Sequence, residues 1–141
     1  MVESLEARAR RLAAAASIEP VEVVSYEERS QFGDGEVVLC VNGILLKIVR
    51  DRGQEFLDVA SICCPEKFYQ FDDVEIAMGW RAIEDVLAKT EPEPLEQVLE
   101  RLGTVIAELR EKLSGDQERF TRARLEHATK ERGVALMRSL Q

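Results

Sequence analysis

The sequence is poor in the residues that most active sites and metal centres need. Among 141 residues there is one histidine, His127, and an odd number of cysteines, three. A zinc site needs four ligands, and the adjacent pair Cys63 and Cys64 with one distant imidazole has no known zinc-ligand spacing. A disulfide framework is excluded by the odd count. We therefore expect no catalytic residue, no metal and no cofactor.

Long apolar runs and phosphate-binding glycine motifs are also missing. The longest apolar stretches, residues 37–41 and 44–46, are far too short to span a membrane. No apolar segment of a secretory signal follows the N-terminal arginines. The glycines at 33, 35 and 43 belong to turn sequences, and neither GxGxxG nor GxxxxGK occurs. These absences, with free thiols typical of a reducing compartment, predict a cytoplasmic protein without a membrane partner.

Basic residues are outnumbered, 19 against 27 acidic ones, which gives a net charge of −8. Nucleic-acid binding needs a cationic surface, so no nucleic-acid partner is expected. The excess is concentrated in residues 66–100, with three basic and ten acidic side chains, whereas residues 116–141 carry a net charge of +2. One interpretation is a solvated acidic face with the basic tail helix beside it. The other is an acidic surface that steers a basic protein partner.

The first third of the chain predicts a helix and then a strand. Apolar residues recur at spacings of three and four over residues 2–17, and Pro20 ends this helix. Residues 21–26 are rich in β-branched side chains and predict a strand, and the polar residues 27–35 predict a loop.

The strongest local signal is a pair of turns between apolar runs. Asn42-Gly43 between residues 36–41 and 44–50 is typical of a two-residue hairpin, and residues 51–54 form a second turn before a strand over residues 55–61. Both turns agree on one register. The predicted pairs are Val41 with Ile44, Leu39 with Leu46, Val37 with Ile48, Arg50 with Glu55, Ile48 with Leu57, Lys47 with Asp58, and Leu46 with Val59.

This register divides the side chains between two faces of a sheet. One face is wholly apolar and must be covered by helices: Val37, Leu39, Val41, Ile44, Leu46, Ile48, Leu57 and Val59. The other places Lys47 and Asp58 among apolar residues: Val38, Cys40, Leu45, Val49, Phe56 and Ala60. A solvent-facing surface alternates to polar residues more cleanly, so we expect the second face to be covered by the chain's own helices or by another molecule.

After Cys63-Cys64-Pro65 the pattern is helical. Asp72 and Glu75 resemble a capping box, and the helix that follows is predicted to bend at Gly79. Apolar residues from Leu95 to Leu113 form a long stripe, and the short stop at Ser114-Gly115 predicts an antiparallel partner helix over residues 116–140, broken near Gly133. The weaker apolar stripe of this partner helix contains Phe120, Ala123, Val134, Met137 and Leu140.

Two further chemistries were weighed. Cys63 or Cys64 with a carboxylate suggests a thiol enzyme, but a reactive thiolate needs a base or cation beside it, and the only imidazole, His127, is far away in sequence. Asp72, Asp73 and Glu75 suggest a divalent-cation site, but their place at a helix N-terminus explains them without a metal.

A resemblance adds to this interpretation. The strand–turn–strand segment from Leu45 to Asp58, followed by Phe71-Asp72-Asp73-Val74 and a helix, resembles small bacterial immunity proteins found beside polymorphic toxins. It covers about a third of the chain and does not include residues 94–140. The resemblance implies a cytoplasmic inhibitor that binds a toxin domain, without identifying its contact residues.

The sequence therefore predicts a single α+β domain over residues 1–141. It consists of an N-terminal helix, an antiparallel meander of three or four strands and a first helix within residues 1–89, and a helical hairpin over residues 94–140. The expected function is non-catalytic binding of a basic protein, for example a toxin domain, and the alternative is a homo-oligomeric adaptor. The residues expected to contact the partner are Asp72, Asp73, Glu75, Glu84, Asp85, Phe56, Lys47 and Asp58.

Overall fold

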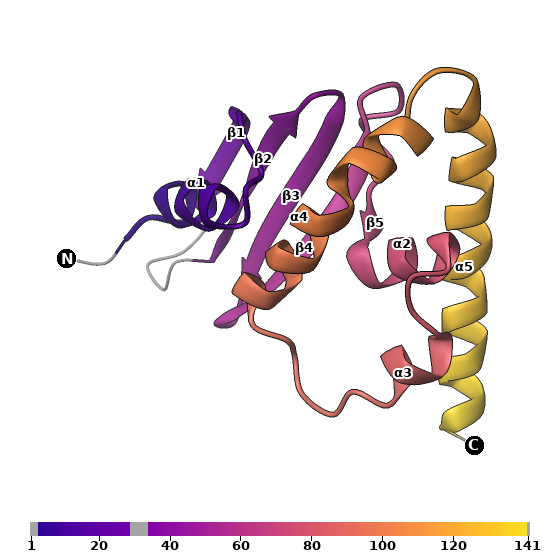
Figure 1. Cartoon of the computed structure of the whole chain (residues 1–141). Coiled ribbons are helices and arrows are strands. Elements are labelled where there is room, and N and C mark those ends of the chain that lie inside the picture. The colour runs from indigo at the N-terminus through magenta and orange to yellow at the C-terminus, as the bar shows by residue number, and fades with distance from the viewer. Residues whose placement is uncertain (1–2, 29–33, 141) are drawn as a thin grey trace.

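A computed structural model of the chain describes residues 3–28 and 34–140, and it has the predicted α+β architecture (Figure 1). The elements in chain order are α1 (Leu5–Ala15), β1 (Glu22–Glu28), β2 (Gly35–Val41), β3 (Ile44–Asp51), β4 (Gln54–Ser61), β5 (Tyr69–Gln70), α2 (Phe71–Met78), α3 (Ile83–Leu87), α4 (Leu95–Lys112), a 3₁₀ turn (Gly115–Gln117) and α5 (Glu118–Ser139).

The sheet is an antiparallel meander in the order β1-β2-β3-β4-β5. Every predicted pair across the two central turns is present, from Val41 opposite Ile44 to Lys47 opposite Asp58. The sheet has five strands where three or four were expected, because two residues, Tyr69 and Gln70, pair with Val59 and Asp58.

The N-terminal elements differ from their predicted bounds by a few residues. The helix expected over residues 2–17 is α1, which begins after Ser4, whose Oγ accepts a hydrogen bond from the Ala7 amide at 3.1 Å. The strand expected over residues 21–26 extends to Glu28. A loop was expected over residues 27–35, but its first two residues belong to β1 and its last to β2. Residues 29–33 of this loop lie outside the described part.

The helical segment after the sheet is two helices rather than one bent helix. α2 ends at Gly79, whose φ of 75° is the left-handed conformation that glycine adopts at low cost. The Trp80 amide donates back to the Glu75 carbonyl at 2.9 Å, which closes this end. The capping-box prediction is wrong: the cap position is Gln70, with no side-chain hydrogen bond, while Asp72 binds Lys89.

The apolar face of the sheet carries the main core. α1 and α4 cross this face (Figure 1), and Leu99, Leu102 and Leu109 of α4 are fully buried in it. The two helices approach closely at Gly103, where a Cβ atom would stand 2.3 Å from the Ala16 carbonyl oxygen. Only a residue without a side chain fits this crossing.

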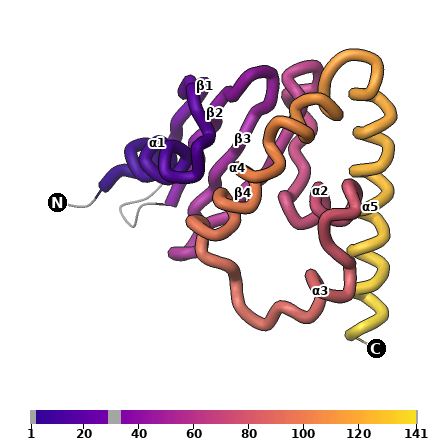
Figure 2. Tube along the Cα trace, viewed as in Figure 1, coloured from indigo at the N-terminus to yellow at the C-terminus, as the bar shows by residue number. Residues whose placement is uncertain are grey.

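The last helix does not lie along α4 as a packed hairpin partner. α5 runs in the opposite direction to α4 after the 3₁₀ turn, but it packs chiefly against α2 (Figure 2). It is also continuous through Gly133, where a break was predicted. Its buried side chains are Glu118, Thr121, Leu125 and Ala128, and the apolar stripe that was expected to form its packing face points outward.

Within residues 3–28 and 34–140, no helix combines the length and the apolar character that crossing a membrane requires.

Candidate protein-binding site

The second face of the sheet is covered only in part. Val38, Leu45 and Ala60 form a small buried cluster with Cys40 and with Phe68 from the segment after β4. The Lys47 ammonium lies 4.2 Å from the centre of the Phe68 ring, a cation–π contact. No residue of a described helix belongs to this cluster. The expectation of a helical cover is therefore wrong, since a loop residue covers the centre.

At the far end of this face, Phe56 remains 44% exposed. It lies in the part of β4 that has no neighbour on its outer side, because β5 pairs only with Asp58 and Val59. Among the described strands none pairs with residues 54–57 from this side. The backbone edge there is open to a partner.

A cleft of about 400 Å³ lies along this open edge. Its walls come from β4 and β5, the start of α2, the end of α3, the segment leading to α4, and the inner side of α5. Phe56, Leu87 and Leu136 contribute exposed apolar surface to it. Parts of the chain that are far apart in sequence thus build one recess with an apolar rim.

Asp58 is the unusual polar group of the cleft. The side chain is half-buried, and it makes no hydrogen bond or ion pair with any described residue, although Lys47 stands opposite in the register. Burial raises the pKa of Asp58, the nearby Lys47 opposes this, and the carboxylates of Asp73 and Glu36 raise it further. A half-buried carboxylate without a hydrogen-bonded cation is costly, and a cationic ligand would relieve that cost.

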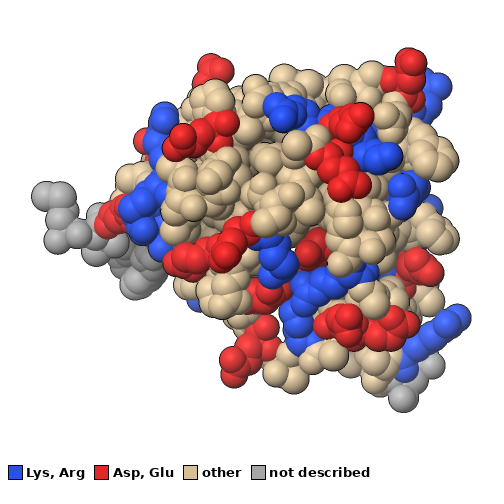
Figure 3. Space-filling model, viewed as in Figure 1, with Lys and Arg blue, Asp and Glu red and all other residues tan. Residues whose placement is uncertain are grey.

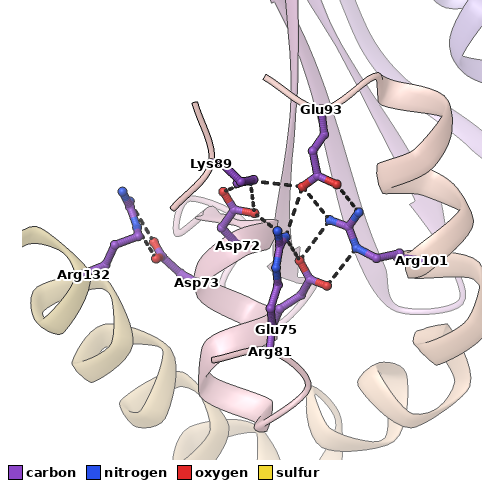
Figure 4. Close-up of polar contacts among 8 residues, drawn as sticks. All are labelled: Asp72, Asp73, Glu75, Arg81, Lys89, Glu93, Arg101 and Arg132. Atoms are coloured by element: carbon purple, nitrogen blue, oxygen red, sulfur yellow. Dashed lines mark hydrogen bonds and ion pairs between the residues drawn. The ribbon is translucent and has the colours of Figure 1, made fainter. Parts of the chain in front are cut away.

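Three other acidic residues of the cleft wall, Glu55, Asp72 and Glu93, are already paired with cations of the chain. Figure 4 shows a charge network in which three carboxylates alternate with three cations. Its members are Asp72, Glu75 and Glu93 with Arg81, Lys89 and Arg101.

Arg101 of α4 binds two carboxylates of this charge network. It donates to Glu75 from Nε at 3.0 Å and to Glu93 from Nη2 at 3.1 Å. Lys89 donates to Asp72 and to Glu93 at 3.0 Å each. Partial burial alone would raise the pKa of Glu93, but the hydrogen bonds from Arg101, Lys89 and Arg81 lower it to about 2. The network therefore ties α2, the segment before α4, and α4 itself together.

A second ion pair attaches α5. Asp73, which is 1% exposed, accepts hydrogen bonds from Arg132 Nε at 2.5 Å and from Thr129 Oγ1 at 3.1 Å. The basic tail helix thus packs beside the acidic segment and neutralises part of it. Figure 3 shows the result on one face of the molecule, where acidic and basic side chains are interspersed.

The residues predicted to contact a partner therefore occupy different environments. Phe56 and Asp58 line the cleft with Asp72, and Lys47 lies on the sheet face beside Phe68. Glu84 and Asp85 are exposed on α3 outside the cleft lining. Asp73 and Glu75 are buried in ion pairs within the chain.

Sequence reasoning missed the cleft itself and the pairing of Asp73 with Arg132. Leu87, Glu91 and Leu136 carried no signal, because the spacing of cleft residues along the chain follows no local period. The one visible hint of the charge network was Lys89 with Glu93, four residues apart.

The surroundings of the Cys64 thiol disfavour its thiolate form. The Cys64 thiol donates to Glu66 at 3.3 Å, and this hydrogen bond raises the pKa of Cys64, although Arg122 lies 3.6 Å from its sulfur. His127 is exposed on α5, where its Nε2 lies 3.7 Å from Glu131. Within the described ranges, no group of three or more His, Cys, Asp or Glu side chains is placed to hold a metal ion.

Comparison of the chain with protein-family models, with curated proteins and with solved structures finds no match in any of the three. The geometry of the cleft therefore carries the functional proposal.

Proposed function

We propose that the protein is a non-catalytic protein-binding module whose partner places a basic side chain and a neighbouring apolar group in the cleft. The observation that carries this proposal is the exposed Phe56 beside the half-buried Asp58, which has no hydrogen-bonded or ion-paired partner. The two side chains line the same recess.

The chemistry of the cleft favours arginine or lysine flanked by an apolar residue. Asp58 offers a carboxylate that a guanidinium would stabilise in its charged form, and Glu91 offers a second, exposed one. Phe56, Leu87 and Leu136 offer apolar area around them. Aromatic anchors beside a desolvated charge are typical of the residues that dominate binding energy in protein interfaces.

An inhibitor of a basic toxin domain, the role that the immunity-protein resemblance implies, is one specific form of this function. The charge of the cleft supports it, because the unpaired groups there are carboxylates while the cations Lys89 and Arg132 are occupied by Asp72 and Asp73. The acidic residues that remain exposed outside the cleft, among them Glu84 and Asp85, would steer such a partner.

An array of short peptides that vary in charge and in one apolar neighbour tests the proposal. We expect the whole chain to bind peptides with an arginine or lysine next to an apolar residue, and to reject their acidic counterparts. Phe56→Ala and Asp58→Asn should each weaken binding by about tenfold, the effect of losing one anchor or one charge-assisted hydrogen bond. The matched controls are Ile62→Ala, an exposed apolar residue outside the cleft, and Asp51→Asn at the exposed end of β3.

Amide chemical shifts in the bound state provide the second readout. Peptide binding should move the signals of Phe56, Asp58 and Leu87 and leave those of the α1 surface unchanged. Binding that survives both cleft substitutions, or shifts confined to another surface, would overturn the proposal.

The thiol-enzyme alternative has no supporting observation. The raised pKa of Cys64 predicts slow alkylation of this thiol near neutral pH, which time-resolved labelling read by mass spectrometry would measure.

The homo-oligomer alternative placed the second sheet face or the stripe from Leu95 to Leu113 against another copy. That stripe is unavailable, because Leu95, Leu99, Leu102, Leu109 and Leu113 are buried within the chain itself. Self-association therefore needs a different surface.

A further inference from the structure

The outer face of α5 carries large apolar side chains that the fold leaves uncovered. Phe120 is 68% exposed, Val134 51% and Met137 64%. With Ala123 they stand on one line, in which His127 and Lys130 occupy the middle positions. The six positions alternate in spacing between three and four residues, which is the pattern of a helix that packs against another helix.

The inner face of α5 makes this exposure unusual. On its inner side the helix buries Glu118 and Thr121 together with Leu125 and Ala128. A surface helix normally turns its most apolar side inward and its polar residues outward. α5 turns large apolar side chains to the outside, which is the feature of a contact surface for another molecule.

A recess lies beside one end of this face. It has a volume of about 320 Å³ between α2 and α5, and Ile76, Ala77, Phe120 and Ala123 form its apolar wall. About three to four helical turns beyond Phe120 and Ala123 on the same face, Val134 and Met137 protrude. The same face of α5 therefore borders a recess at one end and carries protruding side chains that could fill such a recess at the other.

Antiparallel pairing of two copies brings these parts together. When Phe120 of one copy stands beside Met137 of the other, Ala123 stands beside Val134, and the two-fold axis repeats both contacts. In the same arrangement Arg124 lies next to Glu131 of the second copy, also twice. Parallel pairing would instead bring Arg124 next to Arg119 and Glu131 next to Glu126 of the second copy, which is unfavourable.

We propose that the outer face of α5 binds the same face of a second copy of this chain in antiparallel orientation. This surface is separate from the cleft proposed above, because the cleft takes Arg132 and Leu136 from the opposite side of α5. A dimer formed in this way leaves both clefts open.

Size-exclusion chromatography with light scattering on the whole chain over a dilution series tests the proposal. We expect a reversible species of twice the 15.9-kDa chain mass. Met137→Glu should abolish it, and Glu131→Arg, which creates two like-charge contacts, should raise the dimer dissociation constant by about tenfold or more. The double variant Arg124→Glu/Glu131→Arg should recover most of the affinity, because it exchanges the two charges.

Circular dichroism of each variant confirms that the helix is intact, which matters because Arg124 also donates a hydrogen bond to the Ala77 carbonyl. Glu108→Arg, the same charge reversal on an exposed position of α4, is the matched control and should leave the dimer unchanged. A strict monomer at every concentration would overturn the proposal and assign the face to a different protein. A dimer that tolerates both Met137→Glu and Glu131→Arg would overturn it as well.

Discussion

α4 and α5 are neighbouring helices of similar length, and each carries apolar residues at helical spacing. In α4 these residues face the sheet, and Leu99, Leu102 and Leu109 are completely buried. In α5 the large apolar residues face outward, and ion pairs such as Asp73 with Arg132 hold its inner side. Apolar periodicity on a helix therefore does not by itself show whether that face is buried within the chain.

The largest expected difference between the two helices comes from removing one apolar side chain from each. Leu102→Ala should lower the free energy of unfolding by about 2–5 kcal/mol, because it leaves a cavity in the main core. Val134→Ala should change it by less than about 0.5 kcal/mol, because the side chain is half exposed. Urea denaturation at a concentration where the chain is monomeric measures both. Equal losses would mean that the outer face of α5 packs inside the chain.

Two helical glycines sharpen the comparison. Gly103→Ala should cost about 1–3 kcal/mol, because its Cβ would overlap the Ala16 carbonyl and force α1 and α4 apart. Gly133→Ala should stabilise the protein by about 0.5–1 kcal/mol, because no atom lies within 4 Å of the added Cβ and alanine favours a helix. In thermal unfolding, the midpoints of the two variants should shift in opposite directions from that of the wild type. A neutral Gly103→Ala would contradict the close crossing of α1 and α4.

Lowering the pH should weaken the charge network that attaches α4, with a smaller effect on the free energy of unfolding than the substitutions above. The pKa of Glu93 falls from an ordinary 4.5 to about 2 in the folded protein, so its contribution to stability is complete above pH 4.5. That contribution is lost as the pH falls from 4.5 to 2, because the folded protein then takes up a proton later than the unfolded chain does. Urea midpoints between pH 5 and 2.5 should fall less steeply in Glu93→Gln than in the wild type. Parallel slopes would exclude Glu93 as the responsible group.

The centre of the sheet was predictable because its information is local. Asn42-Gly43 and the turn before Gln54 both specify the same register, and a one-residue slip would move a whole apolar face into water. Arg50 and Glu55 form the predicted ion pair across β3 and β4 at 3.0 Å. Lys47, by contrast, lies over Phe68, a contact that its position opposite Asp58 did not indicate.

The cleft and the orientation of α5 were not predictable, because both depend on contacts between distant residues. Arg132 and Asp73 are 59 positions apart, and nothing local marks them as partners. A two-residue strand such as β5 is too short for a period-two pattern to appear. Phe56 was identified correctly as a residue of the less covered sheet face, whereas the exposed side of α5 was assigned to the core.

α5 presents Arg132 and Leu136 to the cleft on one side and Val134 and Met137 to solvent on the other, within six consecutive residues. A shift or tilt of this short stretch would change both surfaces at once. By thermodynamic reciprocity, any factor by which a cleft ligand alters self-association must equal the factor by which self-association alters affinity for that ligand. The final turns of α5 would therefore couple two equilibria, the self-association of the chain and the binding of a ligand in the cleft.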